Sequence, residues 1–160
     1  MEINWIAILL AAFSSLIIGF IWYHPKVFGN AWMKEIGFTN EDTKDFSIIK
    51  TLGVSFIYAV FISITLQFLV IHQWGVFSSQ AAIKEVDPSI YQNFMDVFGH
   101  TYRTFKHGAL HGFLTGLFFA IPLVGTSALY EKRSFKYVLI SGGYWLACFI
   151  VMGGIICMME

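Results

Sequence analysis

Four long stretches of this chain contain no aspartate, glutamate, lysine or arginine, and they constrain its fold more than any other feature. These stretches are Ile3–Tyr23, Thr51–Ile71, His107–Tyr130 and Tyr137–Met159, and each has at least 21 residues. A helix needs about 20 apolar residues to cross the ~30 Å hydrocarbon core of a bilayer. Because a continuous helix satisfies its own backbone hydrogen bonds in lipid, the sequence predicts four membrane-spanning helices.

The predicted fold is therefore an all-α integral membrane protein, a four transmembrane helix bundle that forms a single membrane domain over residues 1–160. The expected spans cover about residues 3–23, 51–74, 105–130 and 135–158. Composition agrees, because charged residues make up 12% of the chain, whereas soluble domains carry about 25%. The ten basic and ten acidic residues cancel, so no net charge attracts nucleic acid and the lipid bilayer is the expected partner.

The first span is expected to remain in the mature protein. Glu2 stands where a secretory signal peptide would carry basic residues, and the apolar stretch is longer than a signal peptide needs.

Basic residues are distributed unevenly between the two sides of the predicted bundle. Loop one, residues 24–50, and loop three, residues 131–136, share one side and together hold seven lysines and arginines. The termini and loop two share the other side and hold three. The positive-inside rule then places loops one and three in the cytoplasm, and both termini and loop two outside.

Both long loops contain helix signals. In loop one, Phe28, Ala31, Trp32 and Ile36 recur at helical spacing, which predicts a short amphipathic helix in the membrane interface. A Thr-x-x-Asp start at Thr39 predicts that the second span begins early, near residue 40. In loop two, Asp87 and Pro88 form a typical helix start, so a second interfacial helix is expected there.

Small residues in the spans predict close helix packing. Gly108, Gly112 and Gly116 lie four residues apart in the third span, and Ala11, Ser15 and Gly19 have the same spacing in the first. Small residues in this register let two helix backbones approach closely. We expect the first and third spans to pack together within one bundle, with homo-oligomerisation as the alternative. Pro122 is expected to kink the third span by freeing the carbonyl of Phe118.

The histidines are the candidate ligands for a metal ion. His107 and His111 are spaced i, i+4, so they share a helix face and could chelate one ion, with His72 as a third ligand. His100 would join them if the helix began as early as Phe98. Either a transition metal or a haem fits such a set, and the alternatives are polar packing residues or a proton-linked role.

No sequence signature of a catalytic site is present. The chain lacks a glycine-rich phosphate loop, a Gly-x-Ser-x-Gly elbow, a His-Glu-x-x-His pair and a Cys-x-x-Cys pair. No acidic residue falls in the spans, which argues against a carboxylate proton relay. The leading interpretation is a non-enzymatic scaffold or subunit of a membrane complex that needs no cofactor. The alternatives are a metal- or haem-binding membrane protein and transport through an oligomeric interface.

Two segments resemble the domain-of-unknown-function 1761 family of small bacterial four-span membrane proteins. The first runs from Asn4-Trp5 through Gly19-x-x-Trp22-Tyr23-x-Pro25 to Phe28-Gly29-x-x-Trp32 and Gly37. The second runs from Tyr130-Glu131 through Ser134-Phe135-Lys136 to Gly142-Gly143-Tyr144-Trp145. The resemblance implies a bacterial inner-membrane protein. It supplies no catalytic residue.

Overall fold

The computed structural model describes residues 1–39, 41–42, 47–83 and 87–160, and all regular structure in these residues is helical. Four helices are long and apolar enough to cross a membrane. They are α1 (Trp5–Trp22), α3 (Ile48–Val70), the continuous α6 (Phe105–Thr115), η2 (Gly116–Ala120) and α7 (Ile121–Tyr130), and α8 (Phe135–Met159). The predicted four-span all-α fold is confirmed.

Polar side chains define where the long helices begin. The Asn4 side chain accepts a hydrogen bond from the backbone N–H of Ala7 at the start of α1. Ser47, Thr104 and Ser134 cap α3, α6 and α8 in the same way. These caps satisfy backbone donors that the first helical turn leaves without an internal partner.

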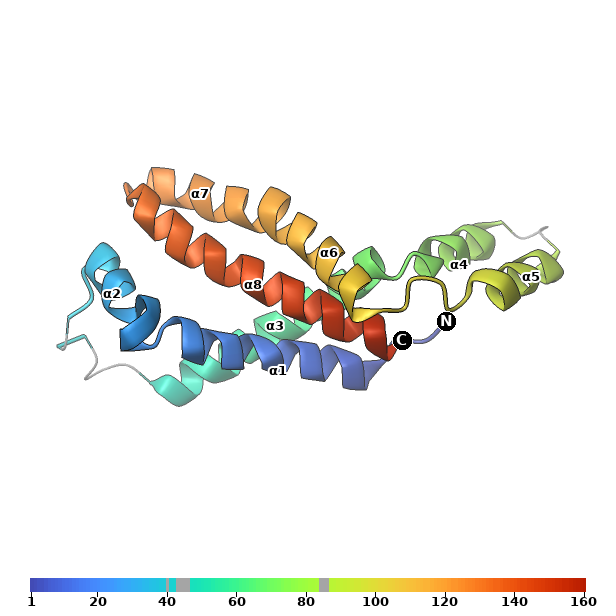
Figure 1. Cartoon of the computed structure of the whole chain (residues 1–160), viewed down its shortest axis with the longest axis horizontal. Coiled ribbons are helices and arrows are strands. Elements are labelled where there is room, and N and C mark those ends of the chain that lie inside the picture. Colours follow the sequence, from blue (N-terminus) through green and yellow to red (C-terminus); the bar gives the residue numbers. More distant parts are fainter. Residues whose placement is uncertain (40, 43–46, 84–86) are drawn as a thin grey trace.

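Helix α8 lies in the middle of the bundle (Figure 1) and packs against α1, α3, α6 and α7. Half of the residues in the most apolar stretch of α8 are buried, a larger share than in any of the other three spans. The buried core includes Ile8, Leu66, Met152 and Ile156, which come from α1, α3 and α8. The remaining apolar surface of the spans, with exposed residues such as Phe20 and Phe118, would face lipid.

The glycine face of the third span packs against α8 and not, as predicted, against α1. A methyl group added to Gly108 would lie 2.1 Å from the carbonyl oxygen of Gly153, and one added to Gly112 would lie 2.0 Å from that of Phe149. The expectation was wrong because span four also carries glycines, and Gly153 lies directly against the backbone of Gly108.

Helix α1 uses its small residues against α3 and α8 instead. Ala11 and Ser15 are buried, and Gly19 lies under the ring of Tyr144. The Tyr144 hydroxyl donates a hydrogen bond to the carbonyl of Ser15 at 3.3 Å. The Trp22 indole N–H donates to the carbonyl of Ile140 at 3.0 Å. Gly19, Trp22 and Tyr144, which belong to the segments of the family resemblance, thus join α1 to α8.

The predicted disturbance at Pro122 takes the form of a π-helical turn. Residues Gly116–Ala120 form η2 immediately before this proline, and α7 continues from Ile121. A wider turn accommodates a proline, which has no N–H to donate to the preceding turn.

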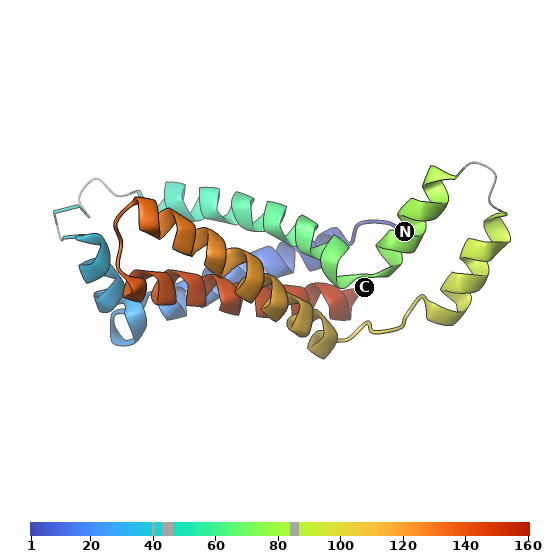
Figure 2. The same cartoon turned by 90° about the horizontal axis from the view of Figure 1, so that it is seen from above.

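The two ends of the bundle differ (Figure 2). Both termini lie at one end, where α4 (Gln73–Ala82) and α5 (Pro88–Phe98) form a hairpin that extends beyond the spans. At the other end lie η1 (Pro25–Gly29), α2 (Asn30–Ile36) and the turn between α7 and α8. Loops one and three therefore share one side, and loop two shares the other with the termini.

Two sequence expectations about the loops need correction, and a third lies outside the described residues. The second span ends at Val70 rather than Trp74, because the chain turns there and Trp74 lies in the first turn of α4. Its predicted early start near residue 40 lies outside the described residues, and the described helix begins at Ile48. The loop-one helix is confirmed over Asn30–Ile36, but its Phe28 belongs to the π-turn η1.

Candidate metal centre

Three histidines converge at the end of the bundle that holds the termini, two from α6 and one from the turn between α3 and α4. The Nε2 atoms of His72 and His107 are 3.0 Å apart, and each ring lies within 5.1 Å, centroid to centroid, of the other two rings. One ligand atom from each of His72, His107 and His111 lies within 4.8 Å of the others. These are the three residues that the sequence proposed as ligands.

The start of α6 decides which histidines can join this cluster. Thr104 caps the helix, and its hydroxyl oxygen accepts the backbone N–H of His107. His107 and His111 then lie one turn apart on the same face. His100 precedes the cap in a turn, so the helix does not begin as early as Phe98, the condition under which His100 would have joined the cluster.

His72 reaches the cluster because the chain turns sharply between α3 and α4. The next residue, Gln73, is 5% exposed, and its side-chain amide donates to the carbonyl oxygens of Phe98 and Thr101 at 2.7 and 3.3 Å. These bonds hold the start of α4 against the segment that leads into α6. The polar side chain of Gln73 therefore fixes the position of the adjacent imidazole.

Tyr102 covers the opposite side of His107. The two rings are stacked at 4.9 Å with an angle of 16° between their planes. Tyr102 has a φ of 66°, a left-handed conformation that costs a non-glycine residue about 1–3 kcal/mol. Its carbonyl oxygen accepts hydrogen bonds from the Thr104 N–H at 2.7 Å and the Cys157 thiol at 3.2 Å, which hold this conformation.

A largely buried polar network lies beside the cluster. The Arg103 guanidinium is 3.4 Å from a carboxylate oxygen of Glu160, and both side chains are about nine-tenths buried. The Gln67 amide, fully buried on α3, donates to the same carboxylate. Arg103 Nε also donates to the carbonyl of Gly99 at 3.2 Å. The network ties α3, α8 and the segment before α6 together.

The donor set consists of imidazoles alone. In the described chain, the three histidines form the only group of at least three histidine, cysteine, aspartate or glutamate side chains arranged to hold a metal ion. The Cys157 thiol donates to the backbone carbonyls of Val70 and Tyr102 instead. At the Zn–N distance of about 2.0–2.1 Å, tetrahedral ligand nitrogens lie about 3.4 Å apart, so modest side-chain rotations would bring these three around one ion.

The sequence missed the residues that bring the cluster together. Gln73, Arg103 and Glu160 carry no local pattern, because their partners lie far along the chain. Tyr102 also has no signal, since nothing in the sequence predicts its left-handed backbone. His24 lies at the opposite end of the bundle, where its Nδ1 accepts the Lys26 N–H.

Comparison with known proteins gives one result. A family model described as a protein of unknown function, DUF1761, matches residues 6–157. No curated protein and no solved structure matches the chain.

Proposed function

The chain belongs to the DUF1761 family, and we propose that it is a membrane protein that binds one divalent transition-metal ion through His72, His107 and His111. The observation that carries this proposal is the convergence of three imidazoles, two from α6 and one from the turn between α3 and α4, with ligand atoms within 4.8 Å of one another. Three neutral imidazoles with a fourth position open are a common donor set for zinc and also suit copper, iron and nickel.

A single ion fits this geometry better than a haem. His72 and His107 touch each other directly through their Nε2 atoms, so no macrocycle fits between them. In the metal-free protein one of these nitrogens donates its proton to the other. Binding an ion would require both Nε2 lone pairs to turn toward the metal. The ring that donates through Nε2 would then carry its proton on Nδ1, where the accepting ring already carries its own.

The packing of the α6 glycines favours the metal hypothesis over the scaffold hypothesis. The glycine face of α6 packs against α8 inside the chain, so it no longer supports association with a second protein. Exposed apolar side chains on the spans are expected of any helix bundle in lipid and favour neither hypothesis.

We also propose that the protein resides in a bacterial inner membrane with loops one and three in the cytoplasm. The seven basic residues in those loops, against three on the other side, support this orientation. The three histidines then lie near the outer surface of the membrane.

Metal analysis of the purified protein tests the function. After incubation with zinc and removal of free ion, we expect about one zinc per chain in the wild type and almost none in the His107→Ala/His111→Ala variant. The matched control is His100→Ala, an exposed histidine at the same end of the bundle but outside the cluster, which is expected to keep the metal. His72→Gln gives a second test because His72 is exposed and its replacement leaves the packing intact.

Two results would contradict the proposal. Substoichiometric zinc, copper, iron and nickel in folded wild-type protein would exclude a specific site. Equal metal loss in the His100→Ala and His72→Gln variants would show that binding does not depend on the cluster. A Soret absorption band after haem addition would favour the haem alternative instead.

A further inference from the structure

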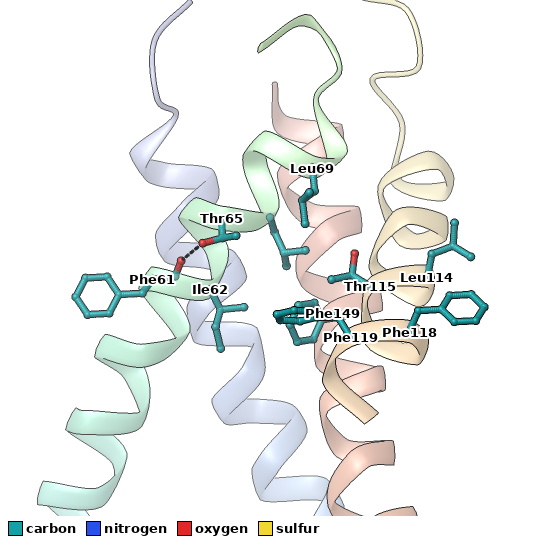
Figure 3. A pocket seen from close by; sticks show the side chains of 10 residues that line it. Phe61, Ile62, Thr65, Leu69, Leu114, Thr115, Phe118, Phe119 and Phe149 are labelled. Carbon is teal, nitrogen blue, oxygen red and sulfur yellow. Dashed lines mark hydrogen bonds between the residues drawn. The ribbon is translucent and has the colours of Figure 1, made fainter. Parts of the chain in front are cut away.

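An apolar groove lies between α3 and the third span, with α8 as its floor. It has a volume of about 680 Å³ and is open on one side. Figure 3 shows Ile62 and Leu69 on the α3 wall, Thr115 and Phe119 on the opposite wall, and Phe149 between them. All of these residues belong to membrane-spanning helices, so the groove lies at the depth of the hydrocarbon core.

The groove offers no polar group to an occupant along its length. Thr65 and Thr115 are the two polar residues among those that line it. The Thr65 hydroxyl donates to the carbonyl of Phe61 at 3.1 Å, and the Thr115 hydroxyl donates to the carbonyl of His111 at 2.8 Å. Since both hydroxyls are satisfied within their own helices, the part of an occupant that enters the groove must be hydrocarbon.

The histidine cluster stands at the outer end of this groove. Leu69 lies three residues before His72 at the end of α3, and Thr115 lies one turn after His111 on α6. One groove wall thus belongs to the helix that ends two residues before His72, and the other to the helix that carries His107 and His111. An occupant that filled the groove would have its outer end next to the cluster.

We propose that the groove and the histidine cluster together bind one membrane lipid with a net anionic phosphate head. Its acyl chain lies along α3 and α6, and a phosphate oxygen takes the open coordination position of the metal ion. This inference rests on the proposed metal site and names the ligand that the site would recognise.

Charge and access favour this occupant. Three neutral imidazoles leave the full charge of a divalent ion uncompensated, and an oxyanion is the natural fourth ligand. The nearby carboxylate of Glu160 is paired with Arg103 and Gln67, so it does not neutralise the ion. Lys106, exposed beside His107, adds positive charge at the same end. An amphiphile with an apolar chain and an anionic head satisfies the groove and the cluster together.

Native mass spectrometry of the zinc-loaded full chain tests the proposal. The protein is reconstituted in vesicles with equal amounts of phosphatidic acid and phosphatidylcholine of matched chains, then released for measurement. We expect one retained phosphatidic acid per zinc-loaded chain, in clear excess over phosphatidylcholine. His111→Ala is expected to lose the zinc and the preference between the two lipids.

Groove-filling variants separate the lipid site from the metal site. Leu69→Trp and Ile62→Trp place a large ring in the groove and are expected to lose the lipid adduct while keeping the zinc. The matched control is Leu52→Trp, on the same helix and similarly exposed (49% against 46% for Leu69) but outside the groove lining. It is expected to retain both zinc and lipid.

The outcomes distinguish the two proposals. Absence of zinc from wild-type protein overturns the metal site and, with it, the metal-bound phosphate. Stoichiometric zinc with equal retention of the two lipids, or with lipid retention unchanged in Leu69→Trp and Ile62→Trp, overturns the lipid site alone. A dimer mass that these variants abolish would show that a second copy of the chain occupies the groove.

Discussion

At the scale of single residues, Arg103 is expected to contribute strongly to stability. Its guanidinium is the cation next to the Glu160 carboxylate, which is itself about nine-tenths buried. Breaking a buried ion pair from one side leaves an uncompensated charge, which costs about 3–5 kcal/mol, whereas removing both charges is often nearly neutral.

We therefore expect Arg103→Ala to lower the free energy of unfolding by about 3 kcal/mol. Arg103→Ala/Glu160→Gln should recover much of that loss, because the amide of glutamine needs no cation. Unfolding in a detergent series, followed by tryptophan fluorescence, measures these two variants and the single variant Glu160→Gln. A double variant as unstable as the sum of the two single variants would show that the pair is not coupled.

Glu35 gives the opposite end of the bundle a dependence on pH. Its carboxylate accepts a hydrogen bond from the Ser134 hydroxyl and lies 3.4 Å from the Lys136 ammonium. The hydrogen bond from Ser134, and then the charge of Lys136, hold the pKa of Glu35 below its usual range. The pKa of Glu35 is therefore lower in the folded state than in the unfolded state. The stabilisation from this contact is complete above the usual glutamate pKa of about 4.3, and it is lost as the pH falls through the lower pKa of the folded state.

The expected result is faster backbone hydrogen exchange in α2 at acidic pH than at neutral pH, after correction for the intrinsic rate. Glu35→Gln should show the faster exchange already at pH 7, because it removes the charge. Glu41→Gln, an exposed acid in loop one, serves as the control. Exchange in α2 that does not respond to pH or to Glu35→Gln would rule out a stabilising role for this contact.

At the scale of helices, the contact between α6 and α8 depends on the absence of side chains. An added methyl at Gly112 would lie 2.0 Å from the Phe149 carbonyl oxygen, which is backbone and cannot move alone. A methyl at Gly53, on α3, would meet nothing within 4 Å. The two glycines therefore differ in packing and not in helix propensity.

We expect Gly112→Ala to destabilise the protein by about 1–3 kcal/mol, because overpacking pushes the two helices apart. Gly53→Ala should leave stability unchanged or raise it by up to about 1 kcal/mol, since alanine is the better helix former. Thermal unfolding followed by circular dichroism compares the two. Similar effects of both substitutions would contradict close packing of α6 on α8.

At the scale of the whole molecule, the proposed orientation makes the two ends of the bundle differ in accessibility. Both native cysteines are buried, so introduced cysteines give the dominant labelling signal. Ser78→Cys lies on α4 at the end with the termini, and Asn30→Cys lies at the start of α2 at the other end, and both positions are exposed.

In intact spheroplasts, a membrane-impermeant maleimide is expected to label Ser78→Cys at once and Asn30→Cys only after permeabilisation. The reversed pattern would place the histidine cluster on the cytoplasmic side and overturn the proposed orientation. Wild-type protein serves as the background control.

The local features of the protein follow from its sequence alone. Four charge-free stretches predicted four spans, because the cost of burying charge in lipid applies to each segment separately. Asp87 and Pro88 predicted the start of α5, and the i, i+4 spacing of His107 and His111 placed both on one face, because capping and helical periodicity act over a few residues.

Only the tertiary structure decided how these local features combine. The glycines of α6 could have packed on α1 or on α8, and backbone complementarity at Gly153 decides for α8. His72 joins His107 and His111 because Gln73 bonds to a segment 25 and 28 residues away. The chain adopts whichever arrangement of helices has the lowest total free energy. That difference between arrangements depends on contacts across the whole molecule, so no short stretch of sequence predicts it.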